Sequence, residues 1–81
     1  MQLSIQLFAR AKDLAGNAII KVALPENATV ADLRTALARQ HPQLDRLIPH
    51  LLVAIGTDYA NDATRLSPTS SVSCFPPVSG G

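Results

Sequence analysis

The chain has 81 residues, of which 47% are hydrophobic and 16% are charged, and its net charge is +1. This length suits a single domain with one modest core, which excludes two catalytic domains or a deep active site built by the chain alone. The near balance of charges argues against a protein that binds nucleic acid or an anionic membrane. One cysteine excludes an internal disulfide framework and a thiolate metal cluster. No signal peptide or membrane-length apolar segment is recognisable, so we expect a cytoplasmic protein.

The pattern of the first 24 residues predicts an antiparallel hairpin. Residues 3–7 alternate apolar and polar, which is the period of a half-buried strand. Residues 18–24 alternate in the same way, with Ala18 at the start of the inward face. Between these strands, residues 10–15 are expected to form a helical turn that Gly16 ends in a left-handed conformation. Two strands this close in sequence most simply pair with each other.

One main helix is expected over residues 30–40. Thr29 and Asp32 have the spacing of a capping box, and Pro42 prevents the helix from continuing. The expected apolar stripe is Val30, Leu33, Ala36 and Leu37, and the side chains expected to face water are Arg34, Arg39 and Gln40.

The second half of the chain predicts short strands and loops. These are an irregular or single-turn segment at 43–50, a strand at 51–55, a turn at 56–58, a short return strand at 59–60, a polar loop at 61–70 and a last strand at 71–75. One helix must then cover one face of a small mixed sheet, and a right-handed crossover places the first and last strands side by side. The order therefore predicts an α+β fold of the ubiquitin-like β-grasp type, with residues 1–75 as the domain and 76–81 as an extended tail.

Sequence motifs for autonomous catalysis are missing. The chain has no glycine-rich phosphate loop, no HExxH and no carboxylate pair in a recognisable acid–base setting. His41 and His50 are isolated, whereas zinc needs three or four ligands together, so we expect no metal site. Cys74 could act as a nucleophile, but its alternation with Val72 favours a buried, small apolar side chain. We expect neither an enzyme that acts alone nor a cofactor bound by this chain.

The C-terminal residues are the unusual part of the sequence. Pro76 and Pro77 stiffen the exit from the last strand, and Gly80 and Gly81 remove every side chain at the end. A tail of this kind can thread a narrow channel and place its carboxylate in a partner's active site; the alternative is a frayed terminus. A carboxylate reacts as an acyl group only after activation, most simply as a mixed anhydride with a nucleotide phosphate. Since the chain has no nucleotide site, a partner enzyme must supply that step.

Three segments resemble one family. Residues 75–81, Phe-Pro-Pro-Val-Ser-Gly-Gly, are similar to the terminal signature of the small subunit of molybdopterin synthase, a β-grasp sulfur carrier. Residues 8–16 resemble the first loop of that family, and residues 29–33 resemble the start of its helix. The departures are Lys12-Asp13 in place of the usual Arg-Glu, no Gly-Asp turn at residues 69–71, and Gly56 where an asparagine is common. They affect loop geometry and not the chemistry of the tail.

This resemblance implies a role for each tail residue. An E1-like activating enzyme would use ATP to adenylate Gly81, and a sulfur donor protein would convert it to a thiocarboxylate. The tail would then enter the large subunit of a heterotetrameric synthase and give its sulfur to cyclic pyranopterin monophosphate. The residues that would thread the channel are Pro76, Pro77, Val78, Ser79 and Gly80.

Two aromatic residues are candidates for a partner interface. Phe75 and Phe8 fall on outward faces of their strands, and interface cores favour aromatic side chains, although single surface aromatics are also common. Arg10 and Lys12 lie in the neighbouring loop, where they could pair with acidic partner residues or simply be solvated.

Three other functions are also compatible with the sequence. A sulfur carrier of the thiazole pathway shares the fold and the Gly-Gly end, but such carriers usually lack the two prolines. A ubiquitin-like modifier would form isopeptide bonds with lysines of other proteins. A plain interaction module would have an inert tail.

Overall fold

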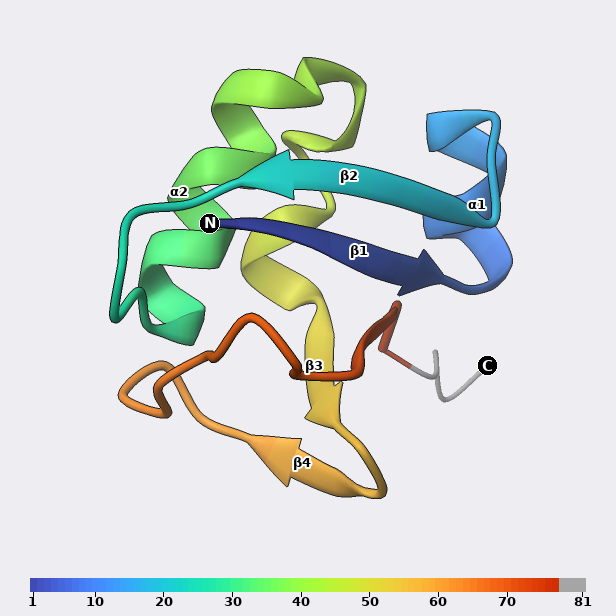
Figure 1. The fold of residues 1–81 in the computed structure, drawn as a ribbon. Helices are drawn as coiled ribbons and strands as arrows, with labels where there is room; N and C mark the ends of the chain where they lie inside the picture. The colour runs from blue at the N-terminus through green and yellow to red at the C-terminus, as the bar shows by residue number, and fades with distance from the viewer. Residues whose placement is uncertain (78–81) are drawn as a thin grey trace.

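The computed structural model describes residues 1–77 of the chain. Its strands and helices follow one another in the predicted order (Figure 1). In chain order the elements are β1 (Gln2–Leu7), α1 (Ala9–Ala15), β2 (Ile19–Ala23), α2 (Val30–Gln40), the 3-10 helices η1 (Pro42–Leu44) and η2 (Ile48–His50), β3 (Leu52–Ile55), β4 (Asp58–Ala60) and β5 (Val72–Phe75).

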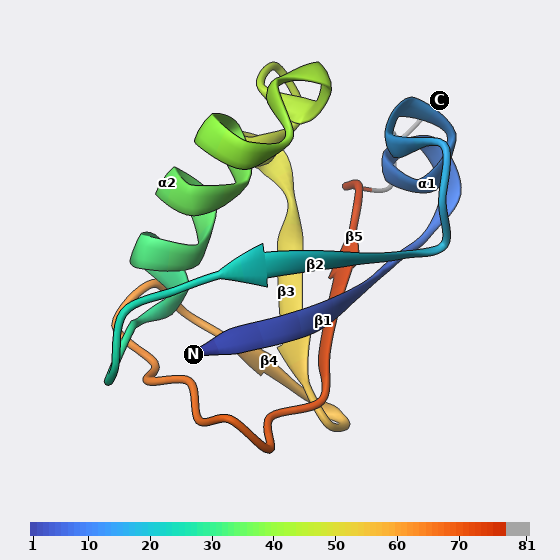
Figure 2. The same ribbon diagram turned by 45° about the horizontal axis from the view of Figure 1, so that its top comes forward.

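The strands form one five-stranded mixed sheet in the order β2-β1-β5-β3-β4. β1 runs parallel to β5, and the other neighbouring strands are antiparallel. The first and last strands are therefore adjacent inside the sheet, and α2 lies along one side of it (Figure 2). This arrangement confirms the predicted α+β fold of the β-grasp type.

Alternating burial joins the sheet to the helix. In β1 the odd-numbered side chains are buried and the even-numbered ones are exposed, as the sequence pattern predicted. Val72 and Cys74 of β5 are buried in the same core, and Leu66, in the loop between β4 and β5, packs into it. The largest fully buried side chains are Ile5, Leu7, Val22, Val30, Leu33, Leu37, Leu44 and Cys74.

Both predicted ends of α2 and the predicted C-terminal end of α1 are confirmed, whereas α1 begins at Ala9, one residue before its predicted start. Thr29 Oγ1 accepts a hydrogen bond from the Asp32 amide at 3.3 Å, and the Asp32 carboxylate accepts from the Thr29 amide at 2.9 Å. This capping box begins α2, and Pro42 follows its last turn. Gly16 ends α1 with φ of 79°, a left-handed conformation that glycine adopts without steric cost. No helix in the described part of the chain is long and apolar enough to cross a membrane.

Two expectations about individual side chains are wrong. Arg34 was expected to face water, but its side chain is only 22% exposed and its guanidinium donates to the carbonyls of Ile48 at 2.6 Å and Leu51 at 2.8 Å. Arg34 Nε also pairs with Asp62 at 2.9 Å. These partners lie 14 to 28 residues away, so helical periodicity could not reveal them. Ala18 was expected inward, but it is exposed because the regular strand begins one residue later.

Candidate functional site

A stacked pair of phenylalanines lies where β1 and β5 end. The parallel register places Leu7 beside Cys74, so the next residues, Phe8 and Phe75, also lie side by side. Their ring centroids are 4.7 Å apart and the ring planes differ by 5°. Phe8 remains 36% exposed and Phe75 is partly buried. The structure thus joins the two aromatic residues that the sequence indicated separately.

Side chains from β3 and β4 extend this pair into an apolar surface. Leu52 is the direct neighbour of Phe75 in the β3–β5 pairing, and Tyr59 lies on the adjacent edge strand. Leu52 is 43% exposed and Tyr59 is 73% exposed. Together with Ala9 and Arg10 they border a hollow of about 560 Å³. We call the larger apolar residues that line it, those other than Ala9, the aromatic patch: Phe8, Leu47, Leu52, Tyr59, Phe75, Pro76 and Pro77.

Sequence reasoning missed Leu47, Leu52 and Tyr59 as members of this patch. A signal was available for Leu52, because its alternation with the buried Val53 points a large apolar side chain outward. Tyr59 was placed in a return strand, but its relation to Phe75 depends on which strands pair. Only the sheet order β5-β3-β4 brings these residues to one surface.

The predicted tail begins at the aromatic patch. Pro76 and Pro77 follow β5 directly, without regular secondary structure, and both line the hollow beside Phe75. Proline has no amide donor, so the strand ladder cannot continue through these two residues. Val78, Ser79, Gly80 and Gly81 lie outside the described residues, and their assigned roles stay predictions.

Two basic residues near the patch have different positions. Arg10 and Lys12 are both exposed on α1, but only Arg10 lines the hollow. Within residues 1–77 the one ion pair is that of Arg34 with Asp62, so neither Arg10 nor Lys12 has an acidic partner there. A charged partner surface could therefore pair with Arg10 without breaking an ion pair of this chain.

Cys74 has the properties of a core side chain. It is fully buried, and burial raises the pKa of its thiol to about 11, an effect that the charge of Arg34 partly opposes. The reactive form of cysteine is the thiolate, so this thiol is inert at neutral pH. In the described part of the chain, no group of three or more His, Cys, Asp or Glu side chains could hold a metal ion.

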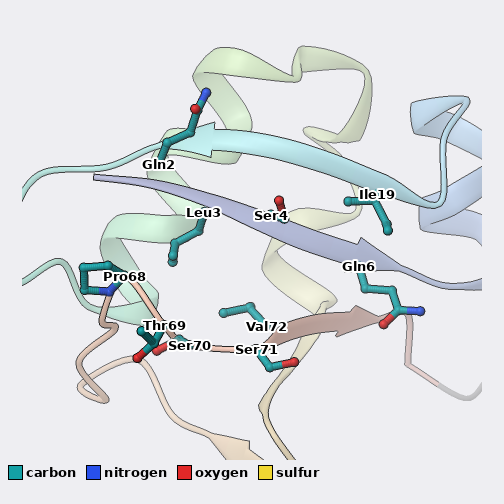
Figure 3. Close-up of a pocket in the computed structure, with 10 residues that line it drawn as sticks. All are labelled: Gln2, Leu3, Ser4, Gln6, Ile19, Pro68, Thr69, Ser70, Ser71 and Val72. Carbon is teal, nitrogen blue, oxygen red and sulfur yellow. The ribbon is translucent and has the colours of Figure 1, made fainter.

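A second hollow lies between β1 and the segment that leads into β5 (Figure 3). Its volume is about 440 Å³, and its lining is mostly amides and hydroxyls. The ten lining residues are Gln2, Leu3, Ser4, Gln6, Ile19, Pro68, Thr69, Ser70, Ser71 and Val72. None of them is charged at neutral pH or carries a nucleophilic thiol or imidazole, so this hollow offers no acid–base or metal chemistry.

The chain matches one protein family over most of its length, including the tail. The model of the ThiS family matches residues 5–81. The chain belongs to the ThiS family. It is 29% identical over 83 aligned residues to the molybdopterin synthase sulfur carrier subunit of Chlamydomonas reinhardtii, with all of both chains covered.

An archaeal protein with a different name is also similar to this chain. The small archaeal modifier protein 1 of Haloferax volcanii is 31% identical, with 94% of this chain and 97% of that protein covered. A crystal structure of the same archaeal protein superimposes with a TM-score of 0.84 at 29% identity, covering all of both chains. These similarities show the family and the fold. The names of the relatives indicate two different roles, a sulfur carrier and a protein modifier.

Proposed function

We propose that this chain is the sulfur-carrier subunit of a molybdopterin synthase, which acts in molybdenum cofactor biosynthesis. The observation that carries the proposal is the aromatic patch at the exit of the Pro-Pro tail. A small domain gains no stability by exposing such a surface, whereas a partner can cover it while receiving the tail. The similarity to sulfur carrier subunits over the full chain supports the same role.

The proposed chemistry takes place at the carboxylate of Gly81. One carboxylate oxygen attacks the α-phosphorus of ATP in an E1-like partner, which forms an acyl adenylate and releases pyrophosphate. A sulfide equivalent from a donor protein then attacks the acyl carbon and displaces AMP, which leaves a thiocarboxylate. In the synthase, the thiocarboxylate sulfur would bond to a carbon of cyclic pyranopterin monophosphate while the carbon–oxygen bond at that carbon breaks and the oxygen substituent leaves. Water finally cleaves the bond between the acyl carbon and sulfur, and the carboxylate returns.

This chain contributes presentation of the tail, and its partners contribute catalysis. The described residues at the patch include no histidine, thiol or carboxylate to move a proton. The large synthase subunit would cover the aromatic patch and supply the catalytic side chains. ATP would be bound by the activating enzyme and not by this chain.

A second candidate function is protein modification, which the similarity to the archaeal modifier protein favours. The same activated Gly81 would then react with a lysine ε-amine and form an isopeptide bond. The two functions separate by product. A carrier purified from its host shows one oxygen replaced by sulfur in its intact mass, whereas a modifier shows ladders of conjugates on anti-tag blots.

Three variants of the terminus test the main proposal: deletion of Gly81, Gly81→Ala, and one extra residue after Gly81. Deletion and extension should abolish thiocarboxylate formation, because each shifts the terminal carboxylate by one residue from the position at which it would be adenylated. Gly81→Ala keeps a carboxylate and should lose roughly 10- to 100-fold through misplacement of the reacting carbon. The assay is pterin product from the reconstituted synthase with activating enzyme, ATP and a sulfur source. Full activity of an uncleaved extended variant would refute the sulfur-carrier function.

A further inference from the structure

The sheet has two edges of unequal length. The order β2-β1-β5-β3-β4 leaves β2 and β4 at the edges. β4 has three residues, whereas β2 has five. An edge strand offers free backbone N–H and C=O groups to a strand from another chain, and a short edge offers few of them. The β2 edge is therefore the one that the fold has to protect.

The backbone groups that face outward from β2 belong to alternate residues. Leu24 donates its amide to the Met1 carbonyl, and Leu7 donates to the carbonyl of Ala18, so the even-numbered residues point toward β1. Hydrogen bonding alternates along an antiparallel strand. The amides and carbonyls of Ile19, Lys21 and Ala23 consequently point away from the sheet.

Side chains from the end of α2 occupy these outward groups. The Gln40 amide group closes a reciprocal pair with Ala23: its oxygen accepts from the Ala23 amide and its nitrogen donates to the Ala23 carbonyl, both at 2.9 Å. His41 Nε2 donates to the carbonyl of Lys21 at 3.1 Å. Gln40 thus bonds to Ala23 as a neighbouring strand would. The helix end is held in place because the His41 amide bonds to the Leu37 carbonyl and Pro42 follows.

We propose that Gln40 and His41 close the β2 edge against strand addition by a second copy of this chain. A second copy is the fitting occupant because an antiparallel strand can pair with itself about a twofold axis. A pairing centred on Lys21 places Ile19 of each copy opposite Ala23 of the other copy. It needs the outward backbone groups of β2 that already form hydrogen bonds with Gln40 and His41. It also sets Lys21 opposite Lys21, and like charges directly opposite each other are destabilising. The edge is therefore closed twice, by the side-chain hydrogen bonds and by the lysine charge.

Amide hydrogen exchange tests the first part of this proposal. In the wild type the Ala23 amide should exchange more slowly than the amides of Ile19 and Lys21, although all three point outward. Gln40→Ala should speed exchange at Ala23 about tenfold, the equivalent of one ordinary hydrogen bond. Gln43→Ala is the matched control, because Gln43 is also exposed and lies near the same helix end. Equal exchange at Ala23 in wild type and Gln40→Ala would overturn the proposal.

Self-association tests the second part. The variant Lys21→Thr/Gln40→Ala/His41→Ala removes the lysine charge and the side-chain hydrogen bonds of Gln40 and His41. It should dimerise with rising concentration in sedimentation velocity. Lys21→Thr alone, which keeps the hydrogen bonds of Gln40 and His41, should sediment as a monomer over the same concentration range. A folded triple variant that stays monomeric, or a wild type that already dimerises through β2, would contradict edge closure. If the triple variant fails to fold, Lys21→Thr/Gln40→Ala is measured in the same way, and a folded double variant that stays monomeric would likewise contradict edge closure.

Discussion

Replacing Phe75 with alanine should weaken two interactions of different kinds. Within the chain it removes the ring that stacks on Phe8 at 4.7 Å, and an aromatic pair of this geometry contributes about 1 kcal/mol beyond its burial. Since Phe75 is only partly buried, the total loss in free energy of unfolding should be about 1–2 kcal/mol, well below the 3–5 kcal/mol of a fully buried phenylalanine. The domain should therefore still fold.

Binding should suffer more than folding. Phe75 lies between Phe8 and Leu52 at the centre of the aromatic patch, so it has the position of an interface anchor. Truncation of such an anchor costs about 2 kcal/mol or more, which corresponds to a roughly 30-fold increase in Kd. Leu52→Ala should give a smaller loss in the same direction, because leucine buries less area than phenylalanine.

Isothermal titration against the large synthase subunit measures this effect, and urea denaturation of the free chain measures the stability term. Ile19→Ala is the matched control, since Ile19 is an apolar residue, 60% exposed, that lies outside the patch. The double variant Phe8→Ala/Phe75→Ala shows by a mutant cycle how much of the loss belongs to the stacked pair. Unchanged affinity of Phe75→Ala, with its fold retained, would remove the patch from the interface.

Other predictions concern the core and the helix. Cys74→Ala should lower the free energy of unfolding by about 1 kcal/mol and leave sulfur transfer intact, and loss of transfer by a folded variant would show that the thiol takes part. Because the pKa of the buried thiol is raised from 9.0 to about 11, the unfolded chain loses its proton first, and the stability from the neutral thiol falls as pH rises from 9 toward 11. Urea titrations should show this slope, up to about 1.4 kcal/mol per pH unit, as the difference between wild type and Cys74→Ala. Arg34→Met should lower the free energy of unfolding by about 2 kcal/mol, because two backbone carbonyls lose a charged donor. The same change at the exposed Arg39 should alter it by no more than about 0.5 kcal/mol, and equal melting temperatures of the two variants would contradict a stabilising role of the Arg34 hydrogen bonds. Thr29→Ala should cost about 1 kcal/mol through loss of the capping box, measured by thermal unfolding, and no change would mean that this cap is not needed.

The sequence by itself determined the elements and their buried faces. Apolar alternation in residues 3–7 and the 3.6-residue period in residues 30–40 are local patterns that need no knowledge of partners. The same holds for the capping box at Thr29 and the left-handed stop at Gly16. These features depend on contacts within a few residues along the chain, so a short stretch of sequence is enough to recognise each of them. The order of the elements then left few arrangements, and the predicted β-grasp fold is the one observed.

Tertiary structure alone decided which surfaces those elements make together. The sequence indicated that Phe8 and Phe75 point outward, but only the register of β1 with β5 stacks them, and only the sheet order adds Leu52 and Tyr59. Arg34 and Gln40 share the polar side of one predicted helix, yet the first clamps distant carbonyls and the second closes a strand edge. Their partners lie 14 to 28 residues away along the chain, and the position of a partner at that separation is fixed by packing of the whole domain and not by any local pattern.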